Sequence, residues 1–358
     1  MSLLMNFIDD SQKLNRTPIS TWPPYHPQQK QYQIIHQGLM IPNLPAPLHY
    51  FNFVSIIGQS NMPMLFNPSL ILNLDPRKTA TTLASVSPKM SKHLNVYSID
   101  QECRFSESQF EFSNRECLKG KFPHFEFFRE DDELSVQLKI KTTNLISNFT
   151  KLKLSIIDHW SLLCKCEGTI NYKGEEFVIQ QMGTFEYARA IQLPYIPIHF
   201  FTYQIINLNE NEQLLLAQIR NNFNHIIQSR IYFRNLKDLT TTMVDQNVEF
   251  VIHRVYPAVI TPNHQKMYLP REFEWRYSAK DLYIKVIGQS HGDYKFGLAA
   301  GFVGSFRYQV QINENQYEGD GGYCEYIDCR PFIWQEEDKE QTQLQNLANN
   351  MPIIAKNK

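Results

Sequence analysis

Alternating apolar and polar residues recur along this chain. In Leu134–Lys141, leucine, valine and isoleucine occupy every second position, with serine, glutamine and lysine between them. Successive side chains of a β-strand point to opposite faces, so this period of two predicts a strand with one buried and one wet face. Ser305–Ile312 alternates in the same way. His49–Ile57 is apolar almost throughout, which is typical of a strand buried on both faces.

The stretch from Cys166 to Arg189 predicts a β-hairpin. Two runs of strand-forming residues are joined at Lys173-Gly174, where glycine can adopt the positive φ of a tight turn. Alternation along the second run predicts two faces. One face carries Val178, Met182, Thr184, Glu186 and Ala188, and the other carries Phe177, Ile179, Phe185, Tyr187 and Arg189.

Further short strands are expected in both halves of the chain, with almost no amphipathic helix between them. Many short strands without intervening helices indicate a sandwich or barrel rather than a parallel α/β sheet. A short helix around Gln31–Gln37 and another over Gln341–Asn350 are the exceptions. The other expected strands are Leu94–Ile99, Gln109–Phe112, His124–Phe128, Lys153–Asp158, His199–Ile206, Gln213–Ile219, Ser229–Phe233, Val248–Val255, Glu272–Tyr277, Asp281–Ile287 and Gly322–Asp328.

A short motif occurs twice. Gly183-x-x-Glu186-Tyr187 returns 139 positions later as Gly322-x-x-Glu325-Tyr326. This suggests one β-unit used twice, with a boundary at Leu193–Pro197, where two prolines interrupt strand pairing. The expected organisation is an N-terminal arm (residues 1–45), a first β-domain (46–192), a second β-domain (193–332) and a C-terminal tail (333–358).

Composition and charge exclude several classes of function. The chain has 358 residues, a net charge of −1 and 13% aromatic residues, and aromatic residues favour strands. Because no basic excess is present to neutralise phosphates, we expect no nucleic-acid partner. No apolar run approaches the roughly 20 residues of a membrane span, so no integral membrane span is expected either. The N-terminus lacks the features of a signal peptide, and the six cysteines fit free thiols, so a cytoplasmic location is expected.

Two motifs that could carry other chemistry are rejected. Gly288-Gln289-Ser290-His291-Gly292 matches a nucleophile elbow, but an α/β-hydrolase needs a histidine after its serine at a later loop, and His291 is the last histidine. Cys164-Lys165-Cys166 lacks a second ligand pair at zinc spacing, so buried thiols are expected and no metal. Phosphate-binding and dinucleotide-binding glycine motifs do not occur, and we expect no cofactor.

The strand-borne Glu186 is the strongest candidate for chemistry. A carboxylate on a partly apolar strand face must be paired, hydrated or protonated, because an isolated buried charge is costly. It would serve as a proton donor or acceptor, or it would hold the polar group of a ligand. The structural alternative, in which Glu186 pairs with a neighbouring arginine at a barrel rim, stays open.

Three further residues are weaker candidates. Alternation places His253 on a face with valines, where a histidine is more often a satisfied core residue than a catalyst. Trp160 and Trp275 could line a cavity or simply fill a core. In Asp158-His159-Trp160 the adjacent Asp158 and His159 would point to opposite faces, which weakens an acid–imidazole dyad.

The chain resembles the AttH-like proteins and carotenoid hydratases (the hydroxyneurosporene synthase family). The resemblance rests on three motifs: Gly168–Gly174 leading into Gly183–Tyr187, Arg271–Trp275 opening a later strand, and Glu318–Tyr326 with its Gly-x-Gly-Tyr-x-Glu pattern. It covers about residues 46–332 and implies two lipocalin-like antiparallel β-barrels in tandem. The Asp-His pair and Trp often found at the end of the first barrel in that family are replaced by Glu186-Tyr187-Ala188-Arg189, so the chain looks more like a bacterial branch than a carotenoid enzyme.

These observations lead to one expected function and two alternatives. The first is binding of a hydrophobic, lipid- or isoprenoid-like small molecule inside a barrel. One alternative is a hydratase or isomerase in which Glu186 or Glu325 protonates a double bond. The other is a non-catalytic structural protein with filled barrels. The catalytic candidates are Glu186 and Glu325, and the ligand-binding candidates are Tyr187, Arg189, Tyr323, His253, Trp275 and Trp160.

Overall fold

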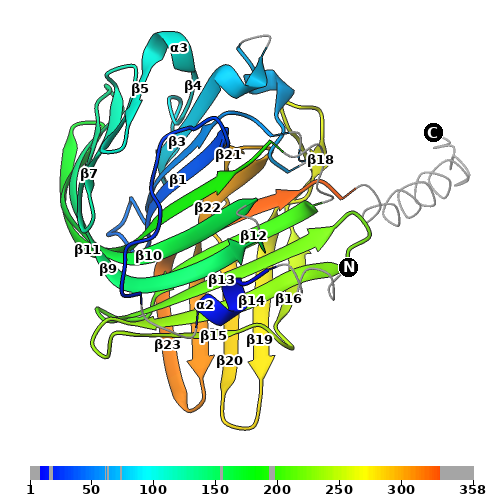
Figure 1. Ribbon diagram of the computed structural model, residues 1–358. Coiled ribbons are helices and arrows are strands. Elements are labelled where there is room, and N and C mark those ends of the chain that lie inside the picture. Colours follow the sequence, from blue (N-terminus) through cyan, green and yellow to red (C-terminus); the bar gives the residue numbers. More distant parts are fainter. Residues whose placement is uncertain are drawn as a thin grey trace, which may run out of the picture.

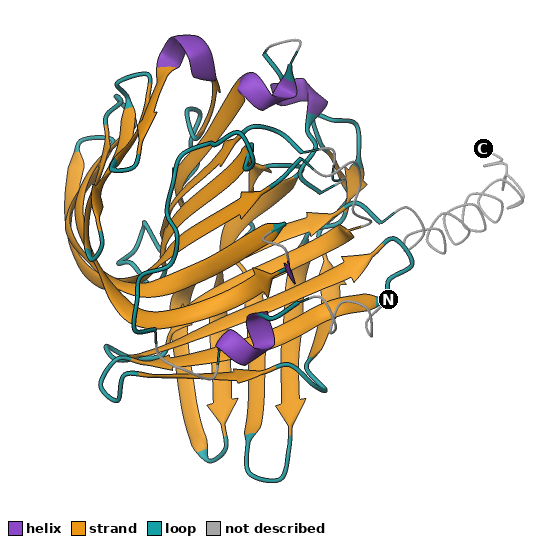
Figure 2. Cartoon of the chain, viewed as in Figure 1, coloured by secondary structure: helices purple, strands orange, loops and turns teal. Residues whose placement is uncertain are grey.

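The computed structural model describes residues 9–15, 19–60, 62, 64–72, 75–153, 156–192 and 198–330. These residues form strands almost throughout (Figures 1 and 2). Their helices are single turns, namely α2 (Ser11–Leu14), α3 (Ile99–Glu102), η1 (Pro68–Leu70) and η2 (Pro76–Lys78). The helix expected at Gln341–Asn350 lies outside the described residues. No helix within the described ranges has the length and apolar character needed to cross a membrane.

The first half of the chain forms an 11-stranded antiparallel sheet in the order β4-β3-β2-β1-β11-β10-β9-β8-β7-β6-β5, which curls into a nearly closed barrel (Figure 1). Its inner face encloses a large hydrophobic cluster rich in phenylalanine. The strands are β1 (Ile34–Ile41), β2 (Phe51–Ile57), β3 (Thr79–Val86), β4 (Leu94–Ser98), β5 (Cys103–Ser106), β6 (Gln109–Phe112), β7 (Glu116–Lys121), β8 (His124–Arg129), β9 (Leu134–Lys151), β10 (Ile157–Tyr172) and β11 (Glu175–Ala190).

The second half forms a 10-stranded sheet that makes a half-barrel. Its order is β15-β14-β13-β12-β23-β22-β20-β19-β16, with β21 paired to β22, and β17 pairs only with β18. A second hydrophobic cluster fills its inner face. The strands are β12 (Ile198–Asn207), β13 (Glu212–Asn221), β14 (Ile226–Asn235), β15 (Thr240–Val244), β16 (Glu249–Val255), β17 (Val259–Ile260), β18 (Lys266–Met267), β19 (Pro270–Ser278), β20 (Tyr283–Ser290), β21 (Lys295–Leu298), β22 (Gly301–Ile312) and β23 (Asn315–Asp328).

Both halves use the same connection, because the first strand of each sheet pairs with the last. β1 pairs with β11 and places Gly38 opposite Glu186, and β12 pairs with β23 and places Tyr203 opposite Glu325. The two glutamates of the repeated motif therefore occupy equivalent positions. The predicted all-β fold of two antiparallel barrels in tandem is confirmed. The chain passes from the first sheet to the second between Ala190 and Ile198, and the independence of the two domains stays a prediction.

The predicted hairpin is confirmed and the predicted helix at Gln31–Gln37 is wrong. β10 and β11 pair along their length, and Lys173 and Gly174 at the turn have φ of 51° and 88°. Ile34–Ile41 is instead strand β1, with seven of its eight residues buried. Because β1 pairs with β2 on one side and β11 on the other, the region expected to be an arm, residues 1–45, contains a central strand of the first sheet.

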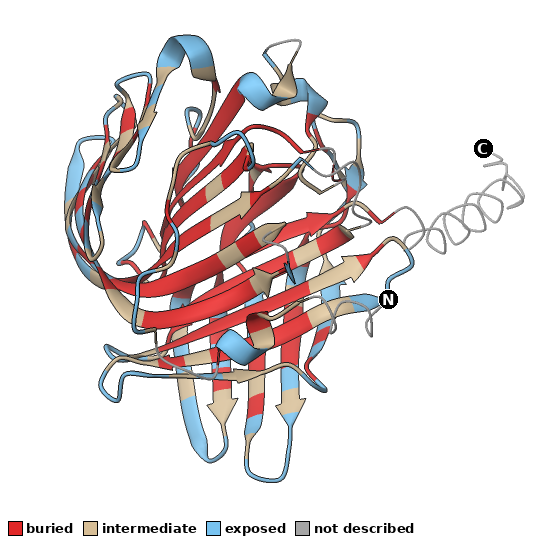
Figure 3. Ribbon diagram, viewed as in Figure 1, coloured by how far each residue is buried: buried red, intermediate tan, exposed pale blue. Residues whose placement is uncertain are grey.

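A third hydrophobic cluster joins the two halves. It combines Tyr50 and Phe149 from the first half with Tyr203, Tyr232 and Tyr323 from the second. Phe149 meets the rings of Tyr203 and Tyr232 edge-on, with centroids 5.4 Å apart in each pair. In Figure 3 buried residues run through the central strands of both sheets, while exposed residues lie mainly at the outer loops and hairpin ends. The central strands are therefore buried on both faces, once against their own core and once against the other sheet.

One ion pair lies inside the first barrel. The side chains of Arg129 on β8 and Glu116 on β7 are both fully buried and contact each other directly. Arg129 also contacts Asp131 and donates to the carbonyl oxygen of Lys92 at 2.7 Å, and Glu116 accepts hydrogen bonds from Thr82 and Tyr97. Removing one member of such a pair leaves a charge without its main partner in a dry interior.

We therefore predict that Glu116→Gln lowers the free energy of unfolding by about 3 kcal/mol, measured by urea denaturation at neutral pH. The matched control is Glu126→Gln on the neighbouring strand β8. Glu126 pairs with Lys119 at 3.2 Å, but both side chains are more than half exposed, so its loss should cost less than about 1 kcal/mol. Equal losses in the two variants would contradict this prediction.

Candidate functional site

Glu186 points out of the first barrel toward the second sheet. Its neighbours along β11, Phe185 and Tyr187, belong to the core of the first barrel. Thr184, on the same face as Glu186, donates its hydroxyl hydrogen to Gln213 of β13 at 3.2 Å. Glu186 is only 3% exposed, and it lies at the junction of the two sheets rather than in a barrel interior. The ligand cavity expected inside a barrel is therefore not where this carboxylate points.

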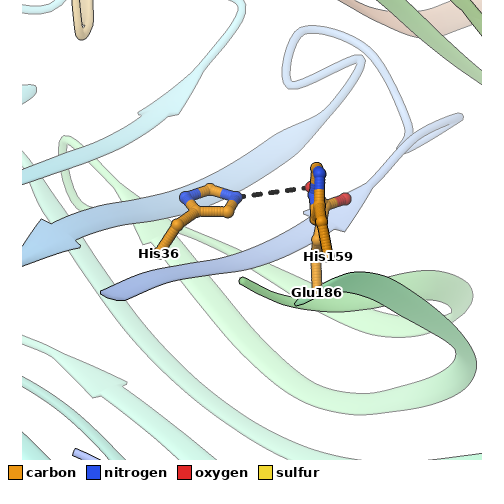
Figure 4. Close-up of side chains that lie close together, drawn as sticks. All are labelled: His36, His159 and Glu186. Atoms are coloured by element: carbon orange, nitrogen blue, oxygen red, sulfur yellow. Dashed lines mark hydrogen bonds and ion pairs between the residues drawn. The ribbon is translucent and has the colours of Figure 1, made fainter. Parts of the chain in front are cut away.

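Two histidines hold Glu186 (Figure 4). His36 on β1 and His159 on β10 flank β11 on its two sides, and both lie opposite Ala188. His159 Nε2 is 2.5 Å from Glu186 Oε1, and His36 Nε2 is 3.3 Å from the same oxygen. The Nδ1 of His36 contacts the carbonyl oxygen of Ser55 at 3.2 Å. The structural alternative predicted an ion pair between Glu186 and a neighbouring arginine at the barrel rim. That prediction is wrong, because the partners are His36 and His159.

A glycine makes room for this cluster. Gly38 lies directly opposite Glu186 in the β1–β11 register. A Cβ atom at Gly38 would come within 3.2 Å of the Cβ of Glu186 and 2.9 Å of the Sδ of Met40, tighter than nearly all real contacts. The sequence Ile34–Ile41 therefore supplies both a ring that contacts the carboxylate and the space for it.

Burial alone would raise the pKa of Glu186. The charge and hydrogen bond of His159, and those of His36, outweigh burial and lower this pKa to about 2. Arg234 of β14 adds a buried positive charge that reaches into the first sheet. It donates from Nε to Ser147 at 3.0 Å and contacts Ser161, the residue opposite Glu186 on β10. At neutral pH Glu186 is therefore an anion surrounded by cationic or proton-donating groups.

Glu325, the equivalent residue of the second half, has the opposite protonation state. Burial and the charge of Glu186 raise its pKa to about 8, although a hydrogen bond from Tyr323 opposes the shift. The Tyr323 hydroxyl donates to Glu325 Oε1 at 2.8 Å. Both residues are at most 5% exposed and face the first half. The interface thus holds one ionised and one protonated carboxyl group at neutral pH, an arrangement that separates a base from an acid.

A small cavity opens beside Glu186. Its volume of about 10 Å³ has room for one water molecule. Two polar atoms of residues that line it, Glu186 Oε2 and the Tyr203 hydroxyl oxygen, are buried and have no hydrogen-bond partner among the described residues. Ser161 lies near the Tyr203 hydroxyl without completing a hydrogen bond. The lining residues are Phe149, His159, Glu186, Phe201, Tyr203, Ala217, Ile219 and Gln228.

Three of the predicted site residues, Glu186, Glu325 and Tyr323, are brought to the interface. Tyr187 and Trp160 lie in the first core, where the Tyr187 hydroxyl donates to the carbonyl oxygen of His26 at 2.9 Å. Trp275 lies in the second core and donates its indole N–H to Gln204 at 2.8 Å. These three rings do not line the cavity beside Glu186.

The other two predicted residues form separate ion pairs. Arg189 binds Asp158 through Nη2 at 2.7 Å and lies over the ring of Tyr32. His253 is 42% exposed on β16 and contacts Glu274 Oε2 at 2.9 Å, so it does not lie in a core. Val251 and His253 are both exposed, so they share one face as alternation predicted, but that face is the outer one and Phe250 on the other face is buried.

Sequence reasoning missed His36 and Tyr203 and discounted His159. Asp158 and His159 do point to opposite faces, as predicted, but His159 finds its carboxylate on the next strand. His36 and His159 lie two residues from the position opposite Glu186, and Tyr203 lies directly opposite Glu325. That motif was the only signal that could have led to them.

Two clusters have donor atoms that metal ions use. The two imidazole nitrogens and one carboxylate of His36, His159 and Glu186 lie within 4.8 Å of one another, as do those of His49, His291 and Asp320. In the first cluster the 2.5 Å contact is that of a charge-assisted hydrogen bond, so a metal would have to displace it. All six cysteines are free thiols, as predicted.

The fold and site define a tandem-barrel protein with a buried carboxylate pair between its halves. Residues 54–342 match a family of unknown function (DUF6670), and the chain belongs to this family. No sequence among curated proteins matches it.

Solved structures show the same fold. A provisionally assigned AttH protein of Nitrosomonas europaea is 12% identical, with a TM-score of 0.61 over 88% of this chain and 99% of that one. Kievitone hydratase from Nectria haematococca is 11% identical, with a TM-score of 0.51 over 82% and 88% of the two chains. The expected resemblance to AttH-like proteins and their lipocalin-like barrels is thereby confirmed.

The carboxyl pair makes the stability of the protein pH-dependent. Between the ordinary glutamate pKa of 4.5 and about 8, folded Glu325 holds a proton that the unfolded chain has released. Stability must therefore fall as the pH rises through this window. We predict that Glu325→Gln, which cannot ionise, matches the wild type near pH 5 and exceeds its free energy of unfolding by a few kcal/mol at pH 9.

Urea denaturation of both proteins at the two pH values measures this gap. Glu318→Gln, at an exposed position of the same strand, controls for the loss of a carboxyl group. A gap between wild type and Glu325→Gln that stays constant from pH 5 to pH 9 would show that Glu325 is already ionised in the folded protein.

Proposed function

We propose that the protein transfers protons to and from a small, mostly apolar molecule held between its two sheets, in a reaction of the hydratase or isomerase type. The observation that carries this proposal is the pair of Glu186 and Glu325. One is held ionised by two histidines, the other is held protonated by burial and by the first. Acid–base catalysis needs two groups in such opposed protonation states, and groups with strongly shifted pKa values are concentrated at functional sites.

Glu325 is the proton donor in this proposal, and Glu186 with His159 is the base. In a hydration, the proton of Glu325 forms a new C–H bond as the π bond of the substrate opens. Water then forms the C–O bond and releases a proton to the Glu186–His159 pair. In an isomerisation the base instead removes a proton from a neighbouring carbon. The pKa of about 2 makes Glu186 unsuitable as the donor that the sequence alone left open.

The cavity supports a ligand with an apolar body and one polar group. Phe149, Phe201 and Ile219 supply apolar walls, and the free Glu186 Oε2 and Tyr203 hydroxyl supply polar contacts. Because the cavity has room for about one water molecule, a substrate must push the aromatic walls apart as it enters. Binding without turnover, the first expectation from the sequence, uses the same contacts. A hydratase among the proteins of similar fold is consistent with turnover.

Solvent deuterium detects such proton transfer without a known substrate. The protein is incubated in D2O with a panel of apolar compounds that carry a double bond beside a hydroxyl or carbonyl group. Mass spectrometry then reports deuterium incorporation or added water. We expect Glu186→Gln and Glu325→Gln each to reduce the rate by at least about a hundredfold, the usual contribution of one acid–base group.

Glu274→Gln is the matched control, because Glu274 also pairs with a histidine, His253, but on the outer face of the second sheet. It should keep the wild-type rate. Native mass spectrometry of the purified protein reports binding separately. A compound that binds to the wild type and to Glu186→Gln without any deuterium incorporation would favour a binding protein over an enzyme.

A further inference from the structure

A row of basic side chains crosses the outer face of the first sheet. Cross-strand pairing aligns Lys121 of β7 with His124 of β8, His124 with Lys141 of β9, and Lys141 with Lys165 of β10. All four residues are exposed and point away from the core. We call these four residues the basic row. Neighbouring strands are about 4.8 Å apart, so the row is roughly 14 Å long.

The adjacent row on the same face has a different composition. Two residues away on each strand, a second row is aligned in the same way and alternates in charge. This alternating row consists of Lys119, Glu126, Lys139 and Glu167. Lys119 and Glu126 form an ion pair at 3.2 Å. Opposite charges across strands stabilise a sheet, and like charges directly opposite each other destabilise it. The alternating row is therefore self-compensating, whereas the basic row is not.

No ion pair forms at the basic row among the residues that the structure describes. Its three lysines contact no carboxylate within 4.0 Å, and the nearest acidic groups on this face belong to the alternating row. Both rows line one groove of about 680 Å³, together with Ser108, Gln109 and Gly120. The groove carries five lysines and one histidine against two glutamates, in a chain whose net charge is −1. A groove of this volume is large enough for a metabolite-sized ligand.

From this juxtaposition we infer that the groove binds a soluble small molecule through a linear oligophosphate group laid along the basic row. Lysine binds phosphate as a point charge, and a straight line of cations fits a chain of anions better than a single compact one. A flat membrane surface cannot follow a concave groove, and a row of four residues bordered by glutamates is too small a field for a nucleic acid. Without a ligand, water only screens the repulsion within the basic row, and an oligophosphate would neutralise it.

This site is distinct from the proposed catalytic site, although both lie on the same face of the first sheet. The strand β10 carries Lys165 at the groove and His159 beside Glu186. A small hydrophobic cluster of Leu145, Leu163 and Met182, with Leu236 packed against it, lies between them. A ligand in the groove therefore has no contact with the carboxyl pair.

Titration with inorganic tripolyphosphate at low salt tests the inference. Isothermal calorimetry should show one site per chain. Lys141→Gln, in the middle of the basic row, should weaken binding by about tenfold or more, as expected for loss of one charged phosphate contact. Lys139→Gln is the matched control, because Lys139 is on the same strand and face but lies between Glu126 and Glu167, outside the four residues proposed to contact phosphate. It should change the affinity by less than about threefold.

A second measurement needs no ligand. Because Lys141 faces His124 and Lys165, Lys141→Gln should raise the melting temperature in low salt, whereas Lys139→Gln, which loses two glutamate neighbours, should lower it. Glu186→Gln should still bind tripolyphosphate, which separates this site from the proposed catalytic one. Absence of tripolyphosphate binding, equal weakening by Lys141→Gln and Lys139→Gln, or binding only to vesicles containing phosphatidylserine would each overturn the inference.

Discussion

The backbone pairing of β1 with β11, and of β12 with β23, determines where the polar groups of this protein meet. Each pairing joins the first strand of a sheet to its last and so places the last strand in the middle of the sheet. Residues from these central strands, Met40 from β1 and Tyr203 and Tyr323 from β12 and β23, then pack together between the halves. A glutamate on the outward face of a last strand is consequently buried by the other half. The repeated Gly-x-x-Glu-Tyr motif therefore produces two buried carboxyl groups.

The equivalent positions around the two glutamates explain why their protonation states differ. Gly38 lies opposite Glu186, and Tyr203 lies opposite Glu325. Two residues earlier, His36 of the first half corresponds to Phe201 of the second. Among the residues that the structure describes, Glu186 therefore has two imidazole partners, while Glu325 has the hydroxyl of Tyr323. A buried pair of carboxyl groups cannot both ionise at low cost, and the histidines decide which one does.

The sequence predicted the strands and the hairpin well because their information is local. Alternation in Leu134–Lys141 and the Lys173-Gly174 turn depend only on neighbouring residues, and both predictions are correct. The candidate glutamates were also found, because a charged residue in a strand-forming run is conspicuous. Ile34–Ile41 was misread because its apolar residues stand in two runs separated by His36, Gln37 and Gly38 and do not alternate, since both faces of the strand are buried.

The partners of the glutamates could not be predicted in the same way. Alternation separates two faces of a strand but does not say which face is covered by a second sheet. Glu186 was therefore grouped with a barrel interior, and Tyr187 and Trp160, which do face that interior, were expected beside a ligand. His36 comes close to Glu186 through the pairing of strands that are 150 positions apart, and His159 does so through the register of the hairpin.

On the outer face of the first sheet, burial determines whether charged side chains need partners. Beside Glu186, Arg234 is fully buried and the two histidines are mostly covered, and each of these side chains contacts an oxygen atom, as His159 does with Glu186 and Arg234 with Ser147. A dry environment makes an unpaired charge too costly to persist there. At the basic row water screens the repulsion, so Lys141 can lie between His124 and Lys165 without unfolding the sheet. The groups around Glu186 must therefore be paired for the protein to fold, whereas the basic row can remain unpaired in the folded protein. The neighbouring alternating row places opposite charges across the strands, which is the arrangement that stabilises a sheet. The pairing of the strands therefore does not explain why the basic row contains only basic residues.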